Sequence, residues 1–201
     1  MVKPMENFNL FDDYLEANDS EIEYDMTSIS EEPYLEYDNK RISCSFTGHR
    51  SISESEKAAL LPRLKSTILY LISQGVKEFH CGGALGFDTL AATVVFDVAR
   101  SHDDIRLVLE LPYENQAEKW KDADKRIYEF LKSKADEINV HSPNPKDKEQ
   151  AVKYLLSRNR IMVDKSHYCV CYAKNDKGGT AYTVNYAKLH DLQIINLAEQ
   201  E

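Results

Sequence analysis

The sequence predicts an α/β protein built on a doubly wound, mainly parallel sheet with helices on both faces. Residues 41–201 alternate between short runs that are apolar almost throughout and longer segments with helical periodicity. Strands of this composition are buried on both faces, which is typical of a parallel sheet covered by helices. A second observation agrees, since glycine-rich turns directly follow apolar runs and precede helical segments.

The first half of this region gives three strands and two helices. An apolar run at residues 42–46 opens it, and Ser53 with Glu56 forms the pattern of a capping box at the start of a helix. Leucine and isoleucine then recur at helical spacing until Gly75, near which the helix stops. The elements that follow are a strand at 76–81, a helix at 86–100 and a strand at 105–111 that Pro112 terminates.

The second half repeats this alternation. Apolar side chains at helical spacing predict a helix at 122–134, and two prolines mark a turn at 142–145. The other elements are a strand at 137–141, a helix at 148–164, a strand at 167–173, a helix at 181–189 and a strand at 192–197. Strands and helices in this order predict a Rossmann-like fold, whose ligands bind beyond the carboxyl ends of the strands.

The charge of the chain is concentrated at its start. The net charge is −9, yet residues 1–40 carry twelve acidic side chains against Lys3 and Lys40, and the remainder has 23 basic and 22 acidic groups. Residues 1–40 also show no sustained helical or strand period. We therefore expect an acidic segment that is disordered or loosely docked, followed by one domain at 41–201. The charge and the six aromatic side chains of this segment suit docking on a basic protein partner.

The cysteines and the hydropathy limit the classes of protein to which the chain can belong. Cys44, Cys81, Cys169 and Cys171 lie in or beside predicted strands without any CxxC pair. We interpret them as small buried hydrophobic side chains, and we expect no metal site and no firmly implied cofactor. No apolar run approaches a membrane span, and the first residues have no signal-peptide pattern. These features favour a cytoplasmic protein with reduced thiols.

Two glycine turns indicate a site for a phosphate-containing ligand. A junction of strand, glycine and helix lets backbone N–H groups approach an anion at the positive end of a helix dipole. A third candidate turn, residues 47–50, follows the first strand, and all three turns are expected to converge at the carboxyl ends of strands. The glycines are Gly82, Gly83 and Gly86 in the first turn, Gly178 and Gly179 in the second, and Gly48 in the third.

Several side chains near these turns have two interpretations. Asp88 lies at a helix start, where its carboxylate either caps backbone donors or accepts a ribose hydroxyl. The Thr180 hydroxyl adds a donor to the second turn, although the same pattern fits an ordinary helix-opening turn. For Arg50 and His49 we favour contact with a phosphate, or with a base in the case of His49, over a location on the solvated surface.

The helix at 148–164 contributes two arginines and an acid. Arg158 and Arg160 are two residues apart and face different sides of the helix, so we expect at most one of them to reach the cleft. Asp164 ends this helix, where the dipole disfavours an anion. Its position predicts a specific partner, either a ribose hydroxyl or Arg160.

These motifs resemble those of the SLOG superfamily of Rossmann-like domains. Residues 82–92 are similar to the Gly-x-Ala-x-Gly-[Ile/Phe]-Asp-x-x-Ala signature of the Smf/DprA DNA-processing proteins. Residues 177–183 are similar to a Gly-Gly-Thr motif that those proteins share with the LOG-type phosphoribohydrolases. The segments at 46–50 and 158–164 resemble the YpsA-like branch. The resemblance implies a nucleotide-binding domain and a homodimer.

One departure from the family pattern bears on catalysis. LOG-type hydrolases have a glutamate shortly after the Gly-Gly-x-Gly-Thr loop, whereas here no carboxylate follows Thr180 before Asp191. Asp88 and Asp164 remain as candidate catalytic acids. We therefore favour a protein that binds a nucleotide derivative, such as ADP-ribose, NAD or a related signalling nucleotide, as a sensor or by sequestration.

Two alternatives remain open. One is an enzyme that hydrolyses an N-glycosidic or phosphoribosyl bond of a nucleotide, and the other is a DprA-like protein that binds single-stranded DNA. Single-strand binding needs a basic groove with stacking aromatic side chains. Because residues 41–201 are nearly neutral and the start of the chain is acidic, we do not expect a nucleic-acid partner.

Overall fold

The computed structural model describes residues 42–198, and the acidic segment predicted at 1–40 lies outside them. The strands of this part are β1 (Ser43–Gly48), β2 (Glu78–Cys81), β3 (Arg106–Leu111), β4 (Glu137–Val140), β5 (Tyr168–Tyr172) and β6 (Gln193–Asn196). They form one parallel sheet in the order β4-β3-β2-β1-β5-β6. The strand order reverses between β1 and β5, which confirms the predicted doubly wound fold.

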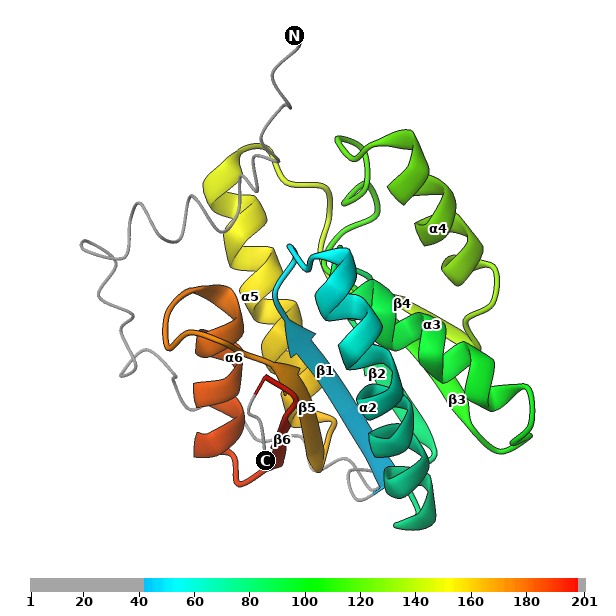
Figure 1. Cartoon of the computed structure of the whole chain (residues 1–201). Coiled ribbons are helices and arrows are strands. Elements are labelled where there is room, and N and C mark those ends of the chain that lie inside the picture. Colours follow the sequence, from blue (N-terminus) through cyan, green and yellow to red (C-terminus); the bar gives the residue numbers. More distant parts are fainter. Residues whose placement is uncertain (1–41, 199–201) are drawn as a thin grey trace, which may run out of the picture.

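Helices cover both faces of the sheet (Figure 1). Those of the described residues are α2 (Glu54–Ser73), α3 (Phe87–Ala99), α4 (Asp122–Lys132), α5 (Lys148–Asp164) and α6 (Gly178–Leu189). One face carries α2, α3 and α4, and the other carries α5 and α6. The Rossmann-like, three-layered α/β architecture follows from strands that are buried on both sides.

The sheet separates two apolar cores. The larger lies under α2 and α3, where the Phe46 ring packs against Phe79 and Phe87 at centroid distances of 6.0 and 6.3 Å. Burial of each such side chain stabilises the fold by about 1.5–3 kcal/mol. The smaller core lies under α6 and includes Cys169 and Cys171. The residues between and after these two cysteines belong to the larger core, as expected for a strand covered on both faces.

Two boundaries differ from the sequence prediction, and both bear on the site. β1 continues to Gly48, because Gly48 pairs with Tyr172 of β5. Gly48 is therefore a strand residue rather than a turn residue. α6 begins at Gly178 instead of residue 181, so Gly178 and Gly179 form the first turn of the helix itself.

The four cysteines are free and buried, in agreement with their interpretation as small hydrophobic side chains. Burial raises the pKa of the Cys44, Cys81 and Cys169 thiols above the ordinary value. No group of three or more His, Cys, Asp or Glu side chains within residues 42–198 is placed to hold a metal ion. In the same residues, no helix is both long enough and apolar enough to span a membrane.

Candidate functional site

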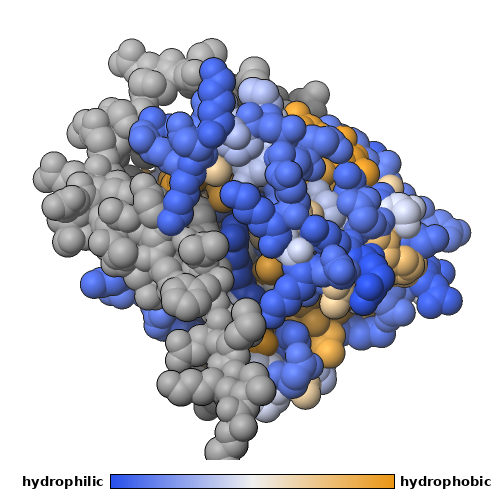
Figure 2. All heavy atoms as spheres, turned by 90° about the horizontal axis from the view of Figure 1, so that it is seen from above, coloured by the Kyte–Doolittle hydropathy of each residue, from blue (hydrophilic) through white to orange (hydrophobic). Residues whose placement is uncertain are grey.

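A small hollow lies at the carboxyl ends of the strands, beside the reversal of strand order. The backbone N–H of His49 donates to the Tyr172 carbonyl at 3.4 Å, and the N–H of Phe87 donates to the His49 carbonyl at 3.1 Å, which draws the ends of β1 and β5 and the start of α3 together. Figure 2 looks down on this end of the sheet and shows a largely hydrophilic face. The hollow measures about 40 Å³ and is lined by Phe46, Thr47, Gly48, Arg50, Ala84, Asp88, Leu155, Arg158, Asn159, Gly179 and Thr180.

The glycines of the first turn make room for other protein groups. Gly86 has φ +75°, and a Cβ atom there would overlap the carbonyl oxygens of His49 and Arg50. A Cβ atom at Gly82 would overlap the guanidinium of Arg158. Gly83 has φ +63°, which L side chains rarely adopt. These glycines therefore leave room for neighbouring protein groups, and none of the three lines the hollow itself.

Arg158 is the arginine of α5 that reaches the site. Its side chain is 3% exposed, and Nη1 donates to the carbonyl of Gly82 and, at 2.8 Å, to the carbonyl of Glu110. Burial lowers the pKa of Arg158, while the negative charge of Asp88 opposes that shift. Two backbone carbonyls thus hold a buried cation at the edge of the hollow.

Asp88 is buried beside it. Its Oδ2 accepts a hydrogen bond from the Ala84 N–H at 3.3 Å, so the carboxylate binds a backbone donor of the turn that precedes α3. Burial raises the pKa of the Asp88 carboxyl, and the charge of Arg158 opposes the rise. Asp88 also lines the hollow, where a ligand hydroxyl would meet it.

The amino terminus of α6 closes the opposite side. Gly178 has φ +82°, and Gly179 and Thr180 line the hollow. The N-cap residue is Lys177, whose side chain makes no capping hydrogen bond, and the first turn contains no acidic residue. The other helices of residues 42–198 all carry an acidic side chain in the first turn. The positive end of the α6 dipole therefore lacks the anion that normally balances it.

His49 and Arg50 have different environments. His49 Nε2 accepts the backbone N–H of Lys174 at 3.0 Å, so its ring holds the loop between β5 and α6. The ammonium of Lys174 pairs with Glu56 and, with Ser53, lowers the pKa of that carboxyl to about 2. Arg50 is half-buried and lines the hollow. The structure thus brings Arg50 to the site and uses His49 to shape the loop beside it.

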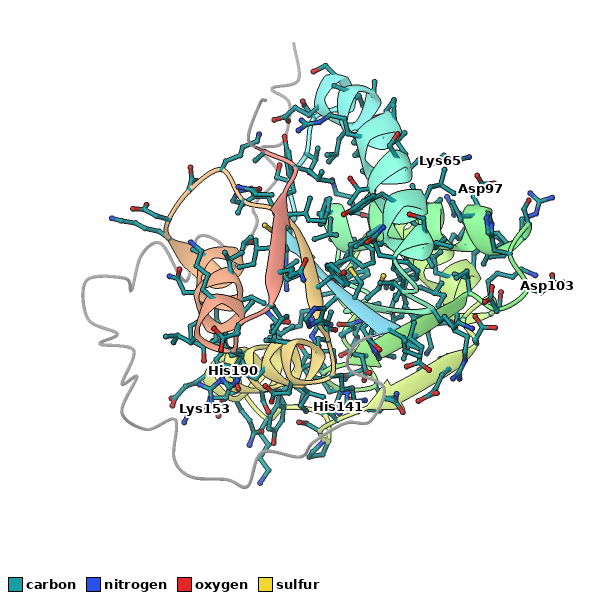
Figure 3. All side chains as sticks on the ribbon, turned by 90° about the horizontal axis from the view of Figure 1, so that it is seen from below. Lys65, Asp97, Asp103, His141, Lys153 and His190 are labelled. Atoms are coloured by element: carbon teal, nitrogen blue, oxygen red, sulfur yellow. The ribbon has the colours of Figure 1, made fainter. Side chains whose placement is uncertain are left out.

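Arg160 and Asp164 lie outside the hollow, on the face that α5 shares with α6. Arg160 Nε donates to the Tyr182 hydroxyl at 2.6 Å. The Tyr186 hydroxyl donates to Asp164 Oδ1 at 3.0 Å, and His190 Nδ1 lies 4.0 Å from the same oxygen. Figure 3 views the opposite end of the molecule and labels His190, whose ring lies 4.2 Å from that of Tyr186. Of the two candidate catalytic acids, only Asp88 lies at the hollow.

Sequence reasoning missed a buried charge cluster behind Arg158. Glu110 is 0% exposed, and its carboxylate contacts His80 at 3.0 Å, His141 at 2.5 Å and Lys165 at 2.9 Å. Burial raises the pKa of Glu110, but the hydrogen bonds from these three side chains outweigh it and hold the pKa well below the ordinary value. The signal was a carboxylate flanked by leucines in an apolar strand, since such a charge needs partners.

The fold and the hollow define a Rossmann-like domain with a candidate ligand site at the reversal of strand order. A family model described as the YspA SLOG family (YpsA) matches residues 46–196. The chain therefore belongs to this SLOG family, and the resemblance of its motifs is confirmed.

Named relatives and a solved structure are also similar to this chain. The chain is 28% identical over 126 residues to a UPF0398 protein of Bacillus cereus strain B4264, which covers 62% of this chain and 67% of the relative. It is 29% identical over 146 residues to a UPF0398 protein of Halalkalibacterium halodurans, covering 72% and 73%. DNA processing protein A from Helicobacter pylori has a similar fold, with TM-score 0.52 and 15% identity over 78% of this chain and 65% of that one.

Proposed function

We propose that the protein binds a phosphate-containing nucleotide derivative at the hollow. Membership of the SLOG family and the Rossmann-like fold support a function of the nucleotide- or DNA-binding type. The observation that carries the proposal is the amino terminus of α6, which has no capping side chain and no acidic residue in its first turn. Its residues Gly179 and Thr180 line the hollow together with Arg50 and Arg158.

A ligand phosphate would supply the missing anion. The amino terminus of a helix carries about half a positive charge, and its unpaired N–H groups bind phosphate oxygens. Gly179 leaves the backbone open to such an approach, and the Thr180 hydroxyl adds a donor. Arg50 brings a full positive charge and a guanidinium that matches phosphate geometry.

The size of the hollow indicates which part of the ligand enters it. A volume of about 40 Å³ lies far below the roughly 300–1,000 Å³ of pockets that enclose a small-molecule ligand, so only part of a nucleotide would enter the hollow. The base and sugar would then lie over the rim of the hollow. ADP-ribose and NAD carry an internal diphosphate, whose oxygens would approach the hollow, and the protein would sense or sequester one of these or a related signalling nucleotide.

Two other functions would be revealed by the experiment that tests this proposal. Asp88, with its raised pKa, is the one acid of the hollow that would serve hydrolysis of an N-glycosidic bond. The Helicobacter pylori protein of similar fold was reported for its binding of single-stranded DNA, so nucleic acid is retained as a candidate ligand although the charge of the chain disfavoured it.

The test is isothermal calorimetry of the full chain with AMP, ADP-ribose and NAD, followed by chromatography of each mixture and a gel shift with single-stranded DNA. We expect binding of at least one nucleotide without turnover. Turnover that is lost in Asp88→Asn would establish the enzyme instead. A salt-sensitive DNA complex without nucleotide binding would establish the DNA-binding function. Absence of nucleotide binding at millimolar concentration would contradict the proposal.

A further inference from the structure

A chain of hydrogen bonds runs beneath the hollow from the first glycine turn to the second. The Arg158 guanidinium donates to the Gly82 carbonyl through Nη1 and to Asn159 Oδ1 through Nε, the latter at 2.9 Å. Asn159 Nδ2 donates to Thr183 Oγ1 at 2.9 Å, and that hydroxyl donates to the Gly179 carbonyl, also at 2.9 Å. α5 thereby joins two turns that are about ninety residues apart in the sequence.

The direction of this chain is fixed by its chemistry. An arginine side chain only donates hydrogen bonds, so the Asn159 oxygen must face Arg158 and its amide nitrogen must face Thr183. Because the Thr183 hydroxyl accepts from that amide, its single proton is available for the Gly179 carbonyl. Each group has one role, and no second arrangement satisfies all of the bonds.

The last bond acts on the peptide unit of the anion site. The carbonyl of Gly179 and the N–H of Thr180 belong to one planar peptide and point in opposite directions. In a helix the carbonyl points toward the carboxyl end, so the Thr180 N–H points toward the amino end, where Thr180 lines the hollow. Fixing the carbonyl through Thr183 therefore fixes the orientation of the N–H. Thr183 is 4% exposed, which keeps solvent away from this bond.

We infer that Asn159 is a positioning residue that couples the two glycine turns, so that the spacing between Arg158 and the amino terminus of α6 is set for a phosphate group. This inference rests on the proposed function for its ligand. It adds a role for Asn159 and Thr183, which act through Arg158 and Gly179 respectively. Their side chains set the geometry of the site, and Asn159 also lines the hollow.

The first experiment measures amide hydrogen exchange without ligand. The N–H groups of residues 182–184 donate to the carbonyls of residues 178–180 when the first turn of α6 is intact. We expect Asn159→Ala and Thr183→Val each to speed exchange there about fivefold, the effect of one lost hydrogen bond. Thr183→Ser keeps the hydroxyl and should exchange like the natural protein. Asn185→Ala, an exposed position on the same helix, is the matched control.

The double variant separates coupling from two independent effects. If Asn159 acts through Thr183, Asn159→Ala with Thr183→Val will exchange no faster than either single variant. Additive acceleration, or an Asn159→Ala protein whose α6 exchanges normally, would overturn the inference. Neither result depends on ligand binding, so failure of the proposed function leaves this test intact.

The second experiment measures the affinity of the same single and double variants for AMP. We expect each single variant to weaken AMP about fivefold, the double variant to weaken it no further, and Thr183→Ser to restore binding. Normal affinity in Asn159→Ala beside accelerated exchange would show that the coupling does not serve the ligand and would overturn that part of the inference. If the natural protein does not bind AMP, the proposed function loses its simplest ligand. The amide hydrogen exchange of the variants then decides by itself whether Asn159 couples the two turns.

Discussion

At the scale of single residues, the site combines groups that would bind the ligand with groups that shape the hollow. Arg50 borders the hollow from the segment after β1, and Gly179 and Thr180 border it from α6. Glycine is required at positions 82 and 86 because the Arg158 guanidinium and the carbonyls of His49 and Arg50 occupy the space of a side chain. A glycine motif in a sequence therefore does not by itself mean that ligand approaches every glycine. In this protein, part of the motif accommodates a buried arginine.

Arg50 is the side chain whose removal should affect binding most directly. Arg50→Ala is expected to weaken a phosphorylated nucleotide by about 1.5–3 kcal/mol, because it removes a charge-assisted hydrogen bond. Calorimetry measures this loss, and Arg126→Ala, an exposed arginine of α4, is the control. Unchanged affinity in Arg50→Ala would place Arg50 among surface residues.

Glu110 should matter for stability in a pH-dependent way. Glu110→Gln leaves His80, His141 and Lys165 around a neutral amide, and breaking such a buried pairing costs about 3–5 kcal/mol near neutral pH. The folded-state pKa of Glu110 lies below the unfolded value of about 4.3, so its stabilisation is present above that pH and is lost as the pH falls below it. Urea unfolding at pH 7 and pH 3.5 should show the deficit of the variant narrowing in acid. Glu129→Gln, an exposed position on α4, should show neither effect. A deficit that is equal at both pH values would contradict the role of the charge.

At the scale of elements, most of the fold could be predicted from periodicity. The apolar runs placed every strand of the described residues, and α5 begins and ends where its pattern predicted, at Lys148 and Asp164. The start of α6 was placed too late, because two consecutive glycines are typical of a loop, whereas here Gly178, with φ +82°, and Gly179 open the helix. The spacing of Arg158 and Arg160 predicted that at most one would reach the cleft. Arg158 lines the hollow and Arg160 does not, and ligand binding by either stays a prediction.

The contacts of the site could be predicted less well. Asn159 and Thr183 lie in segments that resemble family motifs, but no motif pairs them, because their hydrogen bond depends on how α5 and α6 pack and not on local sequence. Likewise, the partners of Glu110 come from β2, the segment after β4 and the segment after α5, which only the folded sheet brings together. Pairings of this kind are tertiary, and one sequence does not reveal them.

The bare amino terminus of α6 gives a prediction in which stability and binding change in opposite directions. Thr180→Asp places a carboxylate in the first turn and should stabilise the free protein by about 0.3–1 kcal/mol, because it complements the helix dipole. The same carboxylate should abolish binding of a phosphate by occupying and repelling its site. Thermal unfolding and calorimetry measure the two effects, with Asn185→Asp as the control farther along the helix. A Thr180→Asp protein that still binds nucleotide would show that the phosphate lies elsewhere.

At the scale of the whole molecule, charge is divided between the acidic start of the chain and a nearly neutral domain. The sheet begins at Ser43, so we predict that residues 1–40 are dispensable for folding. Deleting them should change the free energy of unfolding by about 1 kcal/mol or less, equivalent to a few degrees in melting temperature. Aggregation or a much lower melting temperature of the truncated protein would show that the acidic segment belongs to the core.

The same truncation should affect binding through long-range electrostatics. Removing twelve acidic groups is expected to raise affinity for an anionic nucleotide at low salt. The gain should fade as salt shortens the Debye length to about 8 Å at physiological ionic strength. Calorimetry at low and at physiological salt measures the affinity of the full chain and of the truncated chain for the nucleotide. A gain that persists unchanged at high salt would point to direct blockage of the site and not to repulsion.

The central claim is that the amino terminus of α6 binds the phosphate of a nucleotide. Nuclear magnetic resonance of the ¹⁵N-labelled chain tests it at the atoms concerned, by titration with AMP, ADP-ribose, NAD and, as the matched control without phosphate, adenosine. We predict that the amide signals of Gly179 and Thr180 shift with at least one phosphorylated ligand and stay in place with adenosine. Signals of these two amides that remain fixed at millimolar concentrations of all three nucleotides, or that move equally with adenosine, would contradict the claim.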